Sequence, residues 1–129
     1  ELIRDLDALR YSVNPYNVNS MTLAAGEATV KNEAWMHSCA QTICLNRTWT
    51  EKELKALGFE MTPSKANFLF VRHPRIGGKE LYLKLKARGV LVRHFDRDRI
   101  RDFNRVTVGS LDDMKALVRE TKAILEEIK

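Results

Sequence analysis

Two arginines that flank a polar loop are the residues of this sequence best suited to chemistry. Arg93 ends the apolar run 90–92, and Arg105 begins the run 106–108. If both runs are β-strands, the two side chains lie at neighbouring strand ends and can point to the same side. A guanidinium group carries paired donors that match two oxygens of a carboxylate or a phosphate. Because Arg105 opens a Val-Thr-Val run, we expect it to be partly buried and to need a charged partner. The pair predicts an anion-binding site.

The loop between these arginines alternates in charge. It contains three arginines interleaved with three aspartates, namely Arg97, Arg99, Arg101, Asp96, Asp98 and Asp102. We interpret them as a solvated loop in which exposed ion pairs are weak. A nucleic-acid interface is an alternative, because basic clusters bind phosphate backbones. The aspartates weaken it, as does the lack of aromatic stacking residues beyond Phe95 and Phe103.

The remaining reactive residue types do not form recognisable sites. His37, His73 and His94 are too scattered to predict a metal site. His94 is either an auxiliary group beside Arg93 or a structural residue. The sequence has no Ser-His-Asp or Cys-His arrangement, no glycine-rich phosphate loop and no C-x-x-C pair.

Composition indicates one soluble domain. The chain has 129 residues, 44% hydrophobic and 30% charged, with a formal net charge of +5. Its apolar stretches are too short to span a bilayer, and the first residues lack the apolar core of a signal peptide. We therefore expect a cytoplasmic protein.

The first half of the chain is expected to be mostly helical. Residues 12–16 contain a proline and indicate an extended entry. Asn19 or Ser20 can cap a helix that continues to residue 30. Asn32 can cap a second helix that ends near Gly58, a residue suited to a left-handed C-terminal cap. That helix would be on the order of 39 Å long at 1.5 Å per residue, a length typical of helices that bridge two domains.

The second half alternates strands and helices. Residues 67–72 and 90–93 are expected strands, joined by a helix that begins at Gly77-Gly78 and ends at Gly89. A third strand covers 105–109. Ser110 caps the last helix, with Asp113 in the capping-box position. The fold class predicted is α/β (α+β), with a small three- to four-stranded sheet covered by helices.

Three ordered motifs resemble the histidinol-phosphate aminotransferases. They are the Pro-Ser-Lys-Ala-Asn-Phe-Leu-Phe-Val run at 63–71, the Gly-Val-Leu-Val-Arg-His-Phe run at 89–95, and the Arg-Val-Thr-Val-Gly run at 105–109. The Asn-Pro-Tyr-Asn-Val-Asn run at 14–19, the helix with Ala24 and Ala25, and the Leu-Gly-Phe run at 57–59 fit the same family. The resemblance covers nearly the whole chain.

The resemblance implies the small C-terminal domain of a fold-type I pyridoxal-phosphate (PLP) enzyme. Residues 32–129 would form this domain, and residues 1–31 a linker and interdomain helix. Its partner would be the large PLP-binding domain of the same chain, within a homodimer. Such enzymes transfer an amino group between histidinol phosphate and 2-oxoglutarate in histidine biosynthesis.

The resemblance also assigns residues. Arg105 would bind the anionic end of the substrate, and Arg93 would assist at a phosphate. His94, Tyr16 and Asn17 are possible auxiliary residues.

Departures from the family pattern limit what this chain does alone. The Schiff-base lysine belongs to a Ser-x-Ser-Lys segment upstream of the matched region, and Lys65 in its Ser-Lys pair cannot replace it. We therefore expect no catalytic, cofactor-binding or metal-binding residues here, and no activity from this chain by itself. Asn104 occupies a position that is apolar in many relatives. The alternatives are a related PLP enzyme such as a threonine-phosphate decarboxylase, or a free-standing anion- or nucleic-acid-binding module.

Overall fold

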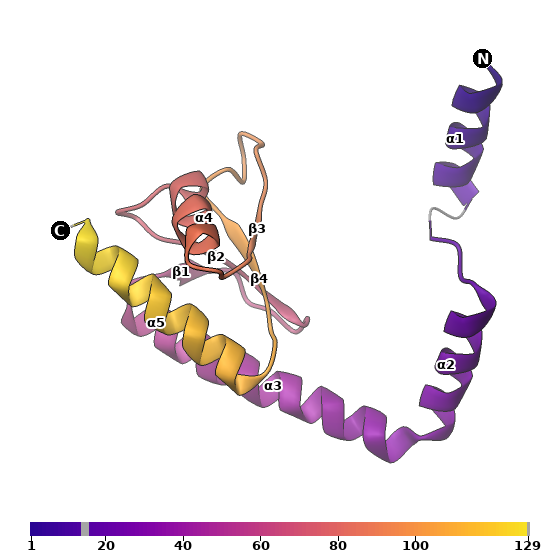
Figure 1. The fold of residues 1–129 in the computed structure, drawn as a ribbon, viewed down its shortest axis with the longest axis horizontal. Helices are drawn as coiled ribbons and strands as arrows, with labels where there is room; N and C mark the ends of the chain where they lie inside the picture. Colours follow the sequence, from indigo (N-terminus) through magenta and orange to yellow (C-terminus); the bar gives the residue numbers. More distant parts are fainter. Residues whose placement is uncertain (14–15, 129) are drawn as a thin grey trace. The chain divides into compact units, whose positions relative to one another are not determined.

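The structure, a computed structural model, describes residues 1–13 and 16–128 and divides into two compact units, Glu1–Ser38 and Cys39–Lys129. The elements of the first unit are α1 (Leu2–Val13), α2 (Ser20–Lys31) and the start of α3 (Glu33–Ala56). The second unit contains the rest of α3, a sheet, α4 (Gly78–Ala87) and α5 (Leu111–Glu127) (Figure 1). No helix in the described ranges is both long and apolar enough to cross a membrane.

Helices α2 and α3 begin at the predicted capping residues. Asn19 Oδ1 accepts a hydrogen bond from the Thr22 N–H at 2.9 Å. Asn32 Oδ1 accepts one from the Trp35 N–H at 3.4 Å. Gly58, just beyond α3, has a φ of +91°, which confirms the left-handed C-terminal cap.

The first helix corrects the expectation of an extended entry over residues 12–16. Helix α1 continues to Val13, so Ser12 is helical. A proline disfavours the helical conformation only in the residue directly before it, which is Asn14. Asn14 and Pro15 lie outside the described residues, and with them the start of the 14–19 motif.

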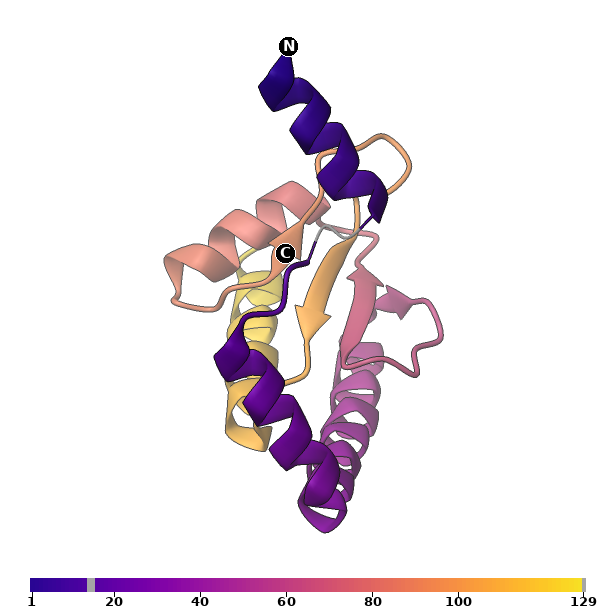
Figure 2. The same cartoon turned by 90° about the vertical axis from the view of Figure 1, so that its right-hand side faces the viewer.

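The second unit contains a four-stranded antiparallel sheet in the order β1-β2-β4-β3 (Figure 2). Its strands are β1 (Glu60–Met61), β2 (Phe68–Arg72), β3 (Arg93–His94) and β4 (Asn104–Thr107). The predicted fold class is confirmed. The expected strand at 90–93 is reduced to its end, because residues 90–92 do not pair with β4, and β1 is an additional strand.

Side chains alternate between the two faces of the sheet, as the pleat requires. Leu69 and Val71 of β2 and Val106 of β4 are buried. They pack with core residues from the three helices of this unit, including Leu54, Leu81, Leu85, Leu117 and Ile124. Helices α3, α4 and α5 thus cover one face of the sheet (Figure 2). We call the other face the open face; from β2, β3 and β4 it carries Phe68, Phe70, Arg72, Arg93 and Arg105, all exposed or half-buried.

Strand β4 lies between the two strands that α4 connects. It is antiparallel to both β2 and β3, so the predicted strand-helix-strand unit is split by an inserted strand. The chain entering β4 passes very close to the start of α4. A Cβ on Gly78 would lie 2.5 Å from the Arg101 carbonyl oxygen. Only glycine therefore fits at the first position of α4.

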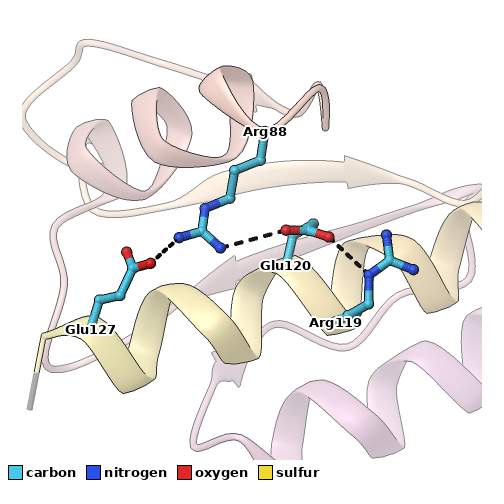
Figure 3. Close-up of polar contacts among 4 residues, drawn as sticks. All are labelled: Arg88, Arg119, Glu120 and Glu127. Atoms are coloured by element: carbon cyan, nitrogen blue, oxygen red, sulfur yellow. Dashed lines mark hydrogen bonds and ion pairs between the residues drawn. The ribbon is translucent and has the colours of Figure 1, made fainter.

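Arg88, at the C-terminal end of α4, connects α4 to α5 (Figure 3). Its Nη1 lies 3.5 Å from Glu120 Oε2, and its Nη2 pairs with Glu127. Arg119 Nε donates to the other Glu120 oxygen at 2.9 Å. The hydrogen bond from Arg119, with a smaller contribution from Arg88, lowers the pKa of Glu120. These contacts join the two helices that flank the core.

Candidate anion-binding site

Arg93 and Arg105 are direct cross-strand neighbours on the open face. Their Cα atoms are partners in the antiparallel pairing of β3 with β4. Residues directly opposite in an antiparallel pair project from the same face with Cβ atoms about 4.5–5.5 Å apart. The structure thus brings together the two arginines that the sequence places twelve positions apart.

Phenylalanine rings lie close to the two guanidinium groups. The Arg105 Cζ lies 5.5 Å from the centre of the Phe68 ring and 5.9 Å from that of Phe95. The Arg93 Cζ lies 5.5 Å from the centre of the same Phe95 ring. Both distances to Phe95 are within the range of cation–π attraction. The rings provide low-dielectric walls that strengthen the interaction of the arginines with an anion.

Neither arginine has an acidic partner in the part of the chain that the structure describes. Arg72, on the same face, differs, because its Nη2 lies 2.6 Å from Glu60 Oε2. The Nε atom of Arg105 is buried and lacks a hydrogen-bond partner among the described residues. A buried unpaired donor on a charged group is costly. Arg93 and Arg105 therefore form a positively charged pair that an external anion would neutralise.

Strand β4 is fixed at both ends by buried amides. Asn104 Nδ2 donates to the Gly78 carbonyl at 2.9 Å, beside Arg105. At the other end, Asn46 Nδ2 of α3 donates to the Gly109 carbonyl at 3.0 Å. Asn104 thus replaces the apolar packing expected at its position with a hydrogen bond to the start of α4. These bonds fix the position of β4, and of Arg105 within it, relative to α4 and α3.

The charged loop 96–102 lies in solvent, as interpreted from the sequence. Arg97, Arg99 and Arg101 are exposed. The contacts of the loop are long, with 3.9 Å from Arg101 to Asp98 and 3.9 Å from Lys79 to Asp96. Exposed pairs of this length contribute little to stability.

One predicted auxiliary residue, His94, lies on the side of the sheet away from the arginines. His94 pairs with Asn104, whose side chain faces the core, so its ring lies on the covered side of β3 and stacks on Tyr82 of α4 with ring centres 6.1 Å apart. Both ring nitrogens of His94 are buried without a hydrogen-bond partner among the described residues. This placement favours the structural alternative for His94, and its auxiliary role stays a prediction. Tyr16 and Asn17 belong to the first unit, and their role stays a prediction.

Sequence reasoning missed the aromatic part of the site. Phe68 and Phe70 are two positions apart in β2, and Phe70 is opposite Arg105 in the sheet. Phe70 also stacks on Phe103, with ring centres 4.6 Å apart and planes at 10°. The period-two spacing of Phe68 and Phe70 was the available signal, because it places both rings on one face of a strand.

The described residues do not fit a covalent PLP site. PLP is bound through a lysine Schiff base, which requires a lysine inside a pocket. Lys65 is exposed, as are the other described lysines except Lys84. Lys84 is half-buried on α4 and pairs with Glu80 at 3.3 Å. The described residues also contain no group of three or more histidine, cysteine, aspartate or glutamate side chains that could hold a metal ion.

The sheet and the paired arginines define a small α/β domain with a candidate anion site on its open face. Residues 4–120 match the family model "Aminotransferase class I and II". The chain belongs to this family.

Curated relatives agree with the family. The chain is 44% identical over 124 residues to the histidinol-phosphate aminotransferase of Syntrophus aciditrophicus, covering 96% of this chain and 34% of the relative. It is 37% identical over 124 residues to that of Chromohalobacter salexigens, covering 96% and 35%. The chain thus spans about a third of the length of these relatives.

Solved structures share the fold. The histidinol-phosphate aminotransferase of Clostridium acetobutylicum is similar with a TM-score of 0.75 at 22% identity, covering 92% of this chain and 36% of that protein. A decarboxylase from Sulfurospirillum multivorans is similar with a TM-score of 0.73 at 18% identity, covering 96% and 33%. At these identities the likeness shows the fold alone.

Proposed function

We propose that this chain is the C-terminal small domain of a PLP-dependent histidinol-phosphate aminotransferase. The enzyme would transfer an amino group between histidinol phosphate and 2-oxoglutarate in histidine biosynthesis. The observation that carries the proposal is the pair Arg93 and Arg105, adjacent on one face and without acidic partners among the described residues. The names of the similar relatives support the substrate.

The two arginines would bind and orient the substrate. Arg105, the more enclosed, would bind the α-carboxylate of glutamate or the phosphate of histidinol phosphate through paired N–H donors. Arg93 would contribute further donors at the phosphate. Holding the anion at a fixed site restricts rotation of the substrate and sets the direction of its Cα–H bond.

The rest of the catalytic machinery would lie elsewhere in a longer polypeptide. PLP, when bound, supplies the electron sink for proton transfer at the substrate Cα, and its lysine would belong to a large domain of the same chain. Residues 1–31 would form a linker and interdomain helix, and residues 32–129 the small domain. We propose a homodimeric, cytoplasmic enzyme in which this part alone is inactive.

A related activity is the second candidate. The same phosphate-binding arginines suit a threonine-phosphate decarboxylase, and a decarboxylase is among the proteins that share this fold. A free-standing nucleic-acid-binding module is not favoured, because the chain matches an aminotransferase family over most of its length.

The test is a pair of substrate assays on the full-length protein. With histidinol phosphate and 2-oxoglutarate we expect stoichiometric glutamate, and no carbon dioxide from phosphothreonine. Carbon dioxide from phosphothreonine without glutamate formation would favour the decarboxylase. Inactivity with both substrates, in a protein that contains its lysine and PLP, would contradict both assignments.

A further inference from the structure

Phe95 is the one aromatic residue that contacts both arginines of the site in the described part of the chain. It follows β3 directly, and its ring centre lies 5.5 Å from the Arg93 Cζ and 5.9 Å from the Arg105 Cζ. The ring therefore contacts two like charges that strand pairing places side by side.

A ring can orient a guanidinium group without using its hydrogen-bond donors. Attraction to the ring face acts on the charge, whereas the N–H donors lie in the guanidinium plane and stay available. Arg72 shows the opposite arrangement on the same face. It lies 5.4 Å from the Phe103 ring centre, but its donors also pair with Glu60. A carboxylate beside Arg93 or Arg105 would compete with the substrate anion, whereas Phe95 does not.

The position of Phe95 is itself defined by packing. Phe70 meets it in an edge-to-face contact, with ring centres 6.4 Å apart and planes at 64°. Phe70 in turn stacks on Phe103. This row of three rings couples the loop after β3 to the central strand β2, so Phe95 is held by neighbours other than the arginines it contacts.

We propose that Phe95 is a positioning residue that holds Arg93 and Arg105 with their donors directed at the substrate anion. The proposal rests on the proposed function of the two arginines as the anion site. It assigns Phe95 an action through the arginines and no contact with the reacting atoms.

The test measures binding of inorganic phosphate to the full-length protein by calorimetry, together with kcat and KM for histidinol phosphate. We expect Phe95→Leu to raise the Kd for phosphate and the KM between about threefold and tenfold, with a smaller change in kcat. Phe95→Tyr retains the ring face and should stay within about twofold of wild type. Tyr82→Leu is the matched control, because Tyr82 contacts His94 and Lys86 and neither the paired arginines nor the row of rings, and should leave both constants unchanged. Phe95→Met, which keeps most of the side-chain volume, replaces Phe95→Leu if the latter does not fold.

Combined variants separate this proposal from the proposed function. In a chain that already carries Arg93→Ala and Arg105→Ala, Phe95→Leu should weaken phosphate binding no further. An equal further loss there, or unchanged binding by Phe95→Leu while Arg105→Ala binds poorly, would overturn the positioning role alone. Unchanged phosphate binding by Arg105→Ala would overturn the anion site and the positioning role together.

Discussion

Asn104 and Gly78 are joined by a hydrogen bond from the Asn104 side-chain amide to the Gly78 carbonyl, 2.9 Å long and fully buried. The bond ties the first residue of α4 to the strand that carries Arg105. It crosses the place where the chain entering β4 touches the start of α4. The position of the arginine thus depends on a contact between two elements that are far apart in the sequence.

Removing this amide should destabilise the fold. Asn104→Ala removes this buried hydrogen bond and most of a buried side chain, so we expect a loss of about 1–3 kcal/mol in the free energy of unfolding. Urea denaturation measures it, with Asn67→Ala as the control because the Asn67 side chain is exposed. Equal midpoints for Asn104→Ala and wild type would contradict the account.

Gly78 and Gly77 should respond very differently to alanine. A Cβ at Gly78 meets the backbone of Arg101 and Asp102, whereas a Cβ at Gly77 meets nothing within 4 Å. We expect Gly78→Ala to cost about 1–3 kcal/mol, as overpacking does, and Gly77→Ala to stay close to wild type. Thermal denaturation of the two variants tests this prediction. Similar melting temperatures would contradict the close contact between Gly78 and the backbone of Arg101 and Asp102.

Arg105 and Arg72 provide a comparison of free and paired guanidinium groups. Arg105→Ala should lower kcat/KM for histidinol phosphate about 10- to 100-fold in the full-length protein, since hydrogen bonds to charged groups contribute about 1.5–3 kcal/mol. Arg72→Ala removes a guanidinium already paired with Glu60 and should change kcat/KM little. Steady-state kinetics test both, and equal effects would show that general positive charge matters more than the paired site.

Stability should fall at mildly acidic pH because of His73. Burial lowers the pKa of this histidine, with Arg75 adding to the effect against an opposing hydrogen bond to the Leu57 carbonyl. Its Nδ1 accepts the Arg75 N–H at 3.2 Å, so its Nε2–H donates to Leu57 and the neutral ring fits. His73 therefore binds a proton more readily in the unfolded chain than in the folded chain. The stabilisation that comes from the neutral form of His73 is fully present at high pH. It decreases as the pH falls below about 6.5, the pKa of this histidine in the unfolded chain.

The measurement is the urea midpoint of unfolding between pH 7.5 and pH 5.5. His73→Gln should show a weaker decrease than wild type over this range. His37→Gln replaces an exposed histidine and should retain the pH dependence of wild type. If His73→Gln retains it as well, another group is responsible.

Local signals in the sequence predicted most of the element boundaries. Asn19, Asn32 and Ser110 cap helices where their side chains can accept backbone N–H groups, and Gly58 and Gly89 end helices with positive φ. These features depend on a few adjacent residues. The adjacency of Arg93 and Arg105 was also predictable, because both lie at the ends of apolar runs.

What the sequence could not predict depends on pairing between distant segments. Strand β1 has two residues and exists only because Glu60 and Met61 meet β2. Residues 90–92 have strand composition, yet they diverge from β4 and remain unpaired. The contacts of Phe95 with both arginines, and the contact of His94 with Tyr82, depend likewise on how the loop leaves the sheet.

Neighbouring residues of β4 project from opposite faces of the sheet. Val106 lies in the core, and Arg105 lies on the open face. Substitutions at the open-face positions of β2, β3 and β4 therefore change the surface that carries the proposed anion site while leaving the helix-backed core intact. A fold arranged in this way can acquire a new substrate preference through few mutations and at little cost in folding stability. The open face is accordingly the part of the domain to randomise when redirecting an enzyme of this family toward another anionic substrate.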